Sequence, residues 1–199
     1  MIRKSRWNTG VSSLAALVAI LVVACPAAEA QVKPFKVTGW GGAPTGLPLP
    51  GQAARFHWAV GHATFLGHYF GVGSVETLTA NPQPNGTITG EFGSGSPFFF
   101  TGANGDVLAC EYGQVAFGAS TPGTFTLHIL SQPAPGTYIV KAYWIAEFVP
   151  QPKLCSGKFA GVSESWIMYA QSEPFLLGSS QPANYSWEGE GSLTFQKAK

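Results

Sequence analysis

Apolar and polar residues alternate along much of the chain that follows residue 30. The clearest example is Thr124–Leu130, in which Phe125, Leu127 and Ile129 alternate with threonine and histidine. Successive side chains of a strand point to opposite faces, so this period of two predicts a strand with one buried face. No window after residue 30 has the apolar spacing of an amphipathic helix.

Further runs rich in aromatic and β-branched residues are separated by turns that contain Gly, Pro and Asn. The segment Trp40–Ala54 contains three prolines, which cannot donate to a central strand, and is expected to form a loop. The runs predict strands at Val32–Thr38, Phe56–Leu66, Tyr69–Thr79, Thr87–Phe92, Pro97–Thr101, Val107–Tyr112, Thr137–Val149, Phe159–Ser172 and Tyr185–Gln196.

Many short strands joined mostly by tight turns favour an all-β fold. An even series of antiparallel strands that closes on itself leaves no exposed sheet edge. We therefore predict a small closed antiparallel barrel of about eight strands, with a β-sandwich as the alternative. The chain has no recognisable internal repeat, so residues 31–199 are expected to form a single barrel domain.

The N-terminal segment has a different pattern. Three basic residues lie among the first six, an uninterrupted apolar run covers Leu14–Cys25, and Ala28–Ala30 provides small residues before a polar one. This layout is typical of a secretory signal peptide, which predicts a signal helix within residues 1–30 and cleavage after Ala30. The apolar run is shorter than the roughly 20 residues of a membrane-spanning helix, so no transmembrane segment is expected in the mature chain.

Cys25 gives the same segment a second interpretation. Val22–Cys25 resembles the lipobox that precedes a lipidated bacterial cysteine. Cleavage after Ala30 predicts a secreted or periplasmic protein, whereas lipidation of Cys25 predicts a barrel anchored to the cell envelope by acyl chains.

Composition narrows the choice of partner. Without residues 1–30 the chain has 169 residues, 8 Lys+Arg and 9 Asp+Glu, which gives a net charge of about −1. No basic patch remains, so nucleic acid is not an expected partner. Charged residues make up only 11% of the full chain, while 25 glycines and 15 prolines accompany 13% aromatics. Such a composition indicates a compact β protein with many turns rather than a disordered chain.

Cys110 and Cys155 are the cysteines that remain beyond the signal segment. Two cysteines in an exported domain favour one disulfide, which would close a loop of about 45 residues. Two separate buried thiols are the alternative.

Four short segments carry a resemblance to a group of secreted bacterial β-barrel proteins. Gly61–Gly67 (GHATFLG) resembles their G-x-A-T-H-L-G segment, and Ala103–Leu108 (ANGDVL) resembles their A-N-G-D-x-L hairpin. Gly157–Val162 (GKFAGV) is similar to their G-R-F-x-G segment, and Trp187–Gly191 is similar to their closing strand. These proteins in turn resemble allene-oxide-cyclase-type barrels. The resemblance implies an exported eight-stranded barrel and leaves the activity open. Phe65 departs from the pattern, because a histidine is usual at that position.

Candidate ligand-binding residues come from the apolar runs. Glu111 lies within Val107–Tyr112, and a carboxylate that faces an apolar interior is a candidate functional group. Trp58, Trp144 and Trp166 are candidates to line a cavity for an apolar or sugar ligand, and filling of the barrel core is the alternative.

The histidines and the sequence motifs do not predict a metal site or a reaction. His57 and His62 would point to opposite faces of a regular strand, so the cluster that they form with His68 is not expected to bind a metal. The sequence has no nucleophile elbow, zinc-protease motif or phosphate-binding loop, and we expect no cofactor.

We therefore expect a non-catalytic binding or interaction module, whose partner is an apolar small molecule or a component of the cell envelope. The alternative is an allene-oxide-cyclase-like enzyme or carrier that acts on a hydrophobic small molecule in the barrel interior. That alternative rests on the likeness in fold.

Overall fold

A computed structural model describes residues 30–196 of the chain, and these residues form an all-β structure. Two short 3-10 helices, η1 (Val115–Phe117) and η2 (Gly157–Phe159), lie between strands. The strands are β1 (Gln31–Ala43), β2 (Arg55–Ala63), β3 (Gly67–Pro82), β4 (Thr87–Gly102), β5 (Val107–Tyr112), β6 (Gly123–Ala134), β7 (Thr137–Pro150), β8 (Trp166–Ser172), β9 (Phe175–Leu176) and β10 (Ala183–Phe195).

The strands close into an eight-stranded antiparallel barrel, as the alternating pattern predicts. The ring runs β1-β2-β3-β4, crosses to β7, and returns through β8 and β10 to β1. Between β4 and β7, one position is shared by two strands: β5 pairs with one half of β4 and β6 with the other half. Because every strand of the ring has two neighbours, the barrel prediction is confirmed over the sandwich alternative.

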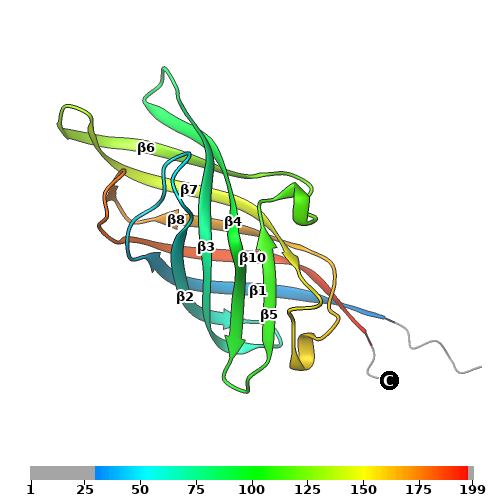
Figure 1. Ribbon diagram of the computed structural model, residues 1–199. Coiled ribbons are helices and arrows are strands. Elements are labelled where there is room, and N and C mark those ends of the chain that lie inside the picture. The colour runs from blue at the N-terminus through cyan, green and yellow to red at the C-terminus, as the bar shows by residue number, and fades with distance from the viewer. Residues whose placement is uncertain (1–29, 197–199) are drawn as a thin grey trace, which may run out of the picture.

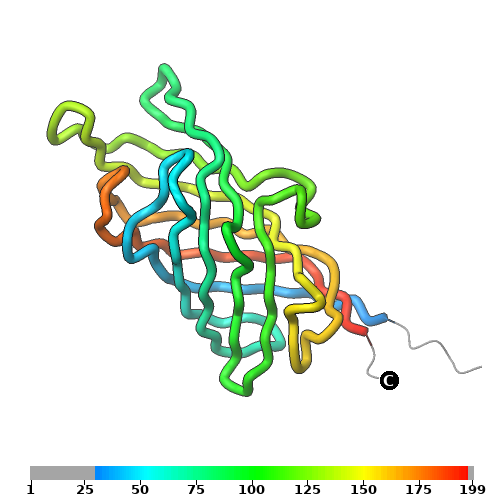
Figure 2. Tube along the Cα trace, viewed as in Figure 1, coloured from blue at the N-terminus to red at the C-terminus, as the bar shows by residue number. Residues whose placement is uncertain are grey.

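The strands of the barrel form two groups, one on each side of the interior. In Figure 1, β2 to β5 run across the front, and β6, β7, β8, β10 and β1 cross behind them at a steep angle. Gln31 pairs with Phe195, so both ends of the described chain lie at one end of the barrel. Figure 2 shows the loop 44–54 at the opposite end, beside the turn that leads into β10.

Aromatic side chains fill the barrel near the chain termini, a region that we call the packed end. Trp166 and Phe148 stack with ring centroids 4.3 Å apart, and Phe35 and Phe100 lie 5.5 Å and 5.9 Å from the Trp166 ring. The packed end comprises Phe35, Phe100, Leu108, Phe148, Trp166 and Leu193, of which none is more than 1% exposed.

Glycines on the inner face of the strands make room for these rings. A Cβ atom at Gly189 would lie 2.5 Å from the Trp166 ring, and one at Gly71 would lie 2.2 Å from Phe98. A small residue opposite a large one lets the narrow barrel close around aromatic side chains. The high glycine content of the sequence is therefore partly a packing requirement.

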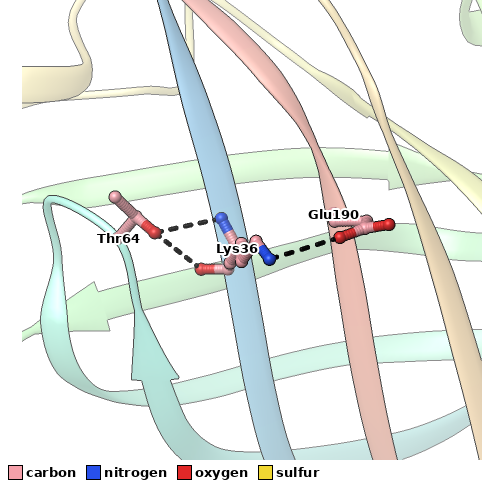
Figure 3. Close-up of polar contacts among 3 residues, drawn as sticks. All are labelled: Lys36, Thr64 and Glu190. Carbon is pink, nitrogen blue, oxygen red and sulfur yellow. Dashed lines mark hydrogen bonds and ion pairs between the residues drawn. The ribbon is translucent and has the colours of Figure 1, made fainter.

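The turn between β2 and β3 is fastened to β1. The Thr64 hydroxyl accepts a hydrogen bond from the Lys36 N–H at 3.0 Å and donates one to the Lys36 carbonyl at 3.2 Å. Figure 3 shows this pair and the Lys36 ammonium group facing Glu190, 3.5 Å away on β10. The ion pair is exposed, so it adds little to stability, and the hydroxyl contacts set the position of the turn.

Several predicted boundaries differ from the structure, and three of the differences are large. The two runs predicted at Thr87–Phe92 and Pro97–Thr101 are one strand, because residues 93–96 continue through irregular pairing with β3. β1 extends into the predicted loop as far as Ala43. The last part of the Phe159–Ser172 run is a strand, whereas its start belongs to η2 and a turn.

The predicted Cys110–Cys155 disulfide is wrong, because both residues are buried free thiols. Cys110 pairs in register with Phe98, so its side chain projects into the barrel interior. The sulfur of Cys155 instead lies beside the backbone of Ala109, 3.4 Å from its nitrogen and 3.5 Å from its oxygen. The Cys110 side chain thus lies in the interior, whereas the Cys155 sulfur contacts the backbone of β5.

The predicted signal helix, the cleavage position Ala30 and the lipidation position Cys25 concern residues that lie outside, or at the edge of, the described range 30–196. Within that range, no helix has the length and apolar character required to cross a bilayer.

Candidate functional site

The end of the barrel opposite the termini contains a cavity, and we call this region the hollow end. A small cavity of about 50 Å³ lies among side chains from strands on both sides of the barrel. Its walls are almost entirely apolar, and the polar atoms that face it come from one histidine and two tyrosines. The lining residues that the following argument uses are Leu47, His57, Val75, Tyr112, Trp144 and Tyr185.

A second cavity of about 150 Å³ adjoins the first beneath the loop 44–54. The two cavities share the side chains of Leu47, Val75, Phe92 and Trp144. A cavity of roughly 150 Å³ with apolar walls is large enough to hold benzene or xenon. The hollow end therefore has space for a small ring or a short alkyl chain. Its further lining includes Pro48, Ile88, Phe125, Leu127, Phe175 and Leu177.

The loop 44–54 covers the hollow end and is held by polar contacts. The Thr77 hydroxyl donates to the Pro48 carbonyl at 2.7 Å, which ties the loop to β3. Arg55 donates to the side chain of Gln52 at 3.0 Å and to the Ser179 carbonyl at 3.3 Å. The prolines explain why this segment cannot extend the sheet, and Arg55 explains why it nevertheless stays against the barrel.

A chain of hydrogen bonds crosses the interior at the inner wall of the smaller cavity. The Nδ1 atom of His57 lies 2.7 Å from the Tyr185 hydroxyl, and its Nε2 atom lies 2.8 Å from the Tyr112 hydroxyl. The Tyr112 hydroxyl also lies 2.7 Å from the Ser74 carbonyl, and the Tyr185 hydroxyl lies 3.1 Å from the Trp58 carbonyl.

A neutral imidazole satisfies this geometry, because it has one N–H donor and one nitrogen acceptor. The Tyr112–Ser74 contact (2.7 Å) is shorter than the Tyr185–Trp58 contact (3.1 Å). This difference favours an arrangement in which the Tyr112 hydroxyl donates to the Ser74 carbonyl and accepts from the Nε2–H of His57. Tyr185 then donates to Nδ1. Tyr185 has a single proton, so in this arrangement its contact to the Trp58 carbonyl is not a hydrogen bond. Each hydroxyl and ring nitrogen of the three side chains has a protein partner, so the group is stable in an apolar interior without a ligand.

Burial keeps these three groups uncharged. Burial lowers the pKa of His57 to about 3. Burial is also the main reason that the pKa values of Tyr112 and Tyr185 lie well above their ordinary range. At neutral pH the hollow end therefore presents hydroxyl and imidazole dipoles but no charge.

The structure places the four predicted ligand-binding residues in different regions. Trp144 lines both cavities, whereas Trp166 lies in the packed end. Trp58 points outward from β2 and packs its ring edge against Trp40, with centroids 5.3 Å apart. Of the four, Trp144 alone reaches the hollow end.

Glu111 does not line either cavity. It lies between Cys110 and Tyr112, which pair with the interior residues Phe98 and Phe148, so its side chain leaves the other face of β5. There the Ser94 hydroxyl donates to its carboxylate, and Glu111 is only 7% exposed.

His57, Tyr112 and Tyr185 were not among the candidate ligand-binding residues. The sequence contains a partial signal, since Tyr112 shares its parity with the apolar residues Leu108 and Cys110. The partners of His57 lie 55 and 128 residues away along the chain. Strand parity gives the face on which a side chain lies and does not predict which distant residues it contacts.

The remaining histidines of the cluster lie apart from His57. His62 and His68 are cross-strand neighbours on β2 and β3, with ring centroids 5.5 Å apart, because the intervening turn reverses the chain. Within residues 30–196, no group of three or more His, Cys, Asp or Glu side chains is arranged to hold a metal ion.

Phe65 lies in the turn between β2 and β3 and adopts a left-handed φ of 67°. Its ring packs edge-on against Phe195 at 5.2 Å, and the Lys33 ammonium lies 5.5 Å from the ring centroid. These contacts give Phe65 a packing role between the turn and the strands that carry the two chain ends.

Comparison with known proteins found no protein-family model, no curated protein and no solved structure that matches the chain.

Proposed function

We propose that this protein is an exported barrel that binds a small, mainly apolar molecule in its hollow end without transforming it. The observation that carries the proposal is the pair of adjoining apolar cavities beneath the loop 44–54. The apolar part of the ligand would occupy the larger cavity, and a hydroxyl group on it would donate to a free lone pair of the Tyr185 oxygen from the smaller one.

The hydrogen-bond chain supports binding over catalysis. A general acid or base needs a proton that it can exchange near the operating pH. His57 has a pKa of about 3, and both of its ring nitrogens already have hydroxyl partners. The chain is therefore suited to orienting a polar group on the ligand rather than to removing a proton from it.

Titration with 1-hexanol, followed by NMR chemical shifts, tests the proposal. We expect saturable binding to the wild-type protein and loss of binding in Val75→Phe, because the new ring would fill the space that both cavities share. Val72→Phe is the matched control: it lies on the same strand but on the outer face, paired with Trp58. Absence of saturable binding, or equal binding by the two variants, would contradict the proposal.

The rival function is an allene-oxide-cyclase-like enzyme that acts on a hydrophobic molecule in the same interior. The linked hydroxyl, imidazole and hydroxyl groups of Tyr185, His57 and Tyr112 favour it, since such a chain can relay a proton. Native mass spectrometry of the protein purified from its producing cells separates the two functions. A bound molecule recovered unchanged after prolonged incubation supports binding, and its conversion supports the enzyme.

Export is a separate part of the proposal and rests on the sequence of residues 1–30. The mass of the mature N-terminus tests it. Cleavage after Ala30 gives a chain that begins at Gln31, whereas lipidation gives a chain that begins at an acylated Cys25. A mature protein that begins at Met1 would contradict export by either route.

A further inference from the structure

A row of polar and aromatic side chains crosses the outer face of the barrel on β1, β10, β8 and β7. It does not belong to the interior cavities of the hollow end. Trp40 on β1 pairs with Ser186 on β10, Ser186 pairs with Gln171 on β8, and Gln171 pairs with Tyr143 on β7. These strands lie side by side in the barrel wall (Figure 1). Neighbouring strands are about 4.8 Å apart, so three strand spacings separate Trp40 from Tyr143.

The surface is hollowed on both sides of this row. One groove of about 520 Å³ lies between Trp40 and Lys141, and a second of about 370 Å³ lies between Tyr143 and Glu188. Gln171 and Ser186 belong to both grooves and form the ridge between them.

The aromatic residues at the ends of the row are exposed and held in place. Trp40 is 60% exposed and Tyr143 is 42% exposed. The Trp58 ring supports Trp40 from one side at an interplanar angle of 74°, which limits the orientations that the Trp40 ring can adopt. Lys141 lies 5.4 Å from the ring of Tyr143. The rings are thus available to a ligand without a large loss of side-chain entropy.

The polar groups between the rings have unused hydrogen-bonding capacity. Among residues 30–196, no side-chain hydrogen bond of Gln171 or Ser186 is formed with another protein group, and Asn184 has one long contact of 3.4 Å to Glu173. An amide offers two donors and two acceptor lone pairs, and a hydroxyl offers one donor and two. This supply matches a ligand rich in hydroxyl groups.

From this surface we infer that the outer face of β1, β10, β8 and β7 is a binding site for a neutral oligosaccharide. A sugar ring has an apolar face that stacks on an aromatic ring and a polar rim that needs amide and hydroxyl partners. Two separated aromatic residues suit a chain of several sugars better than a single one. The row alternates ring, hydroxyl, amide and ring, and Tyr169, which is 49% exposed, adds a third ring to the second groove.

The charges of the grooves favour an uncharged ligand. Lys141 and Glu173 flank the groove beside Trp40, and Glu188 lies in the other groove. The mixed signs provide neither a basic surface for a nucleic acid or a sulfated chain nor a uniformly acidic one.

Titration calorimetry of the whole mature chain with cellohexaose, chitohexaose and maltohexaose tests this inference. We expect saturable binding of at least one hexasaccharide, about tenfold weaker in Trp40→Ala because a stacked ring is lost. Gln171→Ala should weaken it about fivefold, through the loss of an amide partner. Phe117→Ala, which removes an exposed ring from η1 outside both grooves, is the control and should bind as the wild type does.

Gln171→Ala changes a surface polar residue, so it tests the site even where Trp40→Ala lowers stability. The inference is overturned if none of the three hexasaccharides binds at millimolar concentration. It is also overturned if Phe117→Ala weakens binding as much as Trp40→Ala does. Concentration-dependent self-association that Trp40→Ala abolishes, without sugar binding, would assign the surface to protein contact and overturn it as well.

Discussion

The packed end and the hollow end of the barrel are built on the same strands but have opposite interiors. At the packed end, Trp166 stacks on Phe148, Phe100 packs at a steep angle against both rings, and none of the three is more than 1% exposed. Phe148 also lines the smaller cavity, so it marks the boundary between the two ends. At the hollow end, Trp144 and Leu47 are only partly buried and border a cavity. The difference shows that one end of this small barrel is densely packed, whereas the other end contains the cavity space that the proposed binding function requires.

The separation follows from where small and large residues meet. At the packed end, glycines such as Gly189 on β10 leave room for aromatic rings of the neighbouring strand, here Trp166 of β8, which allows dense packing. At the hollow end, the loop 44–54 replaces a strand as the cover, and its prolines and short aliphatic side chains fill space less completely. A closed barrel of this size can thus be densely packed in one half and contain cavities in the other.

The largest expected difference between the two ends is the loss of stability when an aromatic side chain is truncated. Phe100→Ala at the packed end removes a fully buried ring and should lower the free energy of unfolding by about 3–5 kcal/mol. Trp144→Ala at the hollow end enlarges an existing cavity and should cost about 1–2 kcal/mol, because part of its surface is already exposed. Urea unfolding followed by circular dichroism measures both. Equal losses would mean that the two ends are packed alike.

A larger aliphatic side chain should lower stability at the packed end and leave it almost unchanged at the hollow end. Ala63 is fully buried opposite Val37, so Ala63→Leu should overpack the core and lower the free energy of unfolding by about 1–3 kcal/mol. Ala170 borders the smaller cavity, and Ala170→Leu should leave stability almost unchanged while it weakens 1-hexanol binding. A large stability loss in Ala170→Leu would show that the cavity is not available to a side chain.

Acidification should act through the hollow end. The folded protein holds His57 at a pKa of about 3, below the ordinary value of 6.5, so the unfolded chain binds the proton more readily. Stability should therefore be complete above pH 6.5 and fall as the pH decreases toward 3, by about 2 kcal/mol between pH 7.5 and pH 5.

Urea midpoints at the two pH values measure this effect, and variants assign it. His57→Gln should remove most of the dependence between pH 7.5 and pH 5. His128→Gln, at an exposed position on β6, should keep it. If both variants respond to pH as the wild type does, His57 is not the group that is held neutral.

The smallest expected effect concerns the cysteines. Cys110 and Cys155 are buried free thiols, and burial raises the pKa of both. Addition of a reducing agent should therefore leave the free energy of unfolding unchanged, and neither thiol should react with iodoacetamide until the protein unfolds. If reduction lowered the free energy of unfolding, the result would contradict the free thiols and support the disulfide that the sequence predicts.

The fold was largely accessible from the sequence, because strand parity is a local property. The alternation around Phe125 and Leu127 correctly predicts the buried face of β6. Parity also places Trp144 and Phe148 on one face of β7, and both point inward. The position of a residue along the barrel axis is not local. For this reason the sequence did not distinguish Trp166, in the packed end, from Trp144, at the hollow end.

The candidate site was much less accessible. His57 acquires its role from hydroxyl groups on β5 and β10, which the closure of the barrel brings together. The disulfide prediction failed because it used the number of cysteines and the expected compartment, whereas the side-chain direction of Cys110 depends on its register with Phe98. Counting and spacing do not determine such three-dimensional relations.

The most direct test of the division between the two ends is crystallography of the protein under xenon pressure. Xenon enters apolar cavities that are large enough to hold it and needs no specific contact. The account predicts one or more xenon atoms among Leu47, Val75, Phe92 and Trp144, and none among Phe35, Phe100 and Trp166. Xenon within the packed end, or a hollow end that remains free of xenon, would contradict the account.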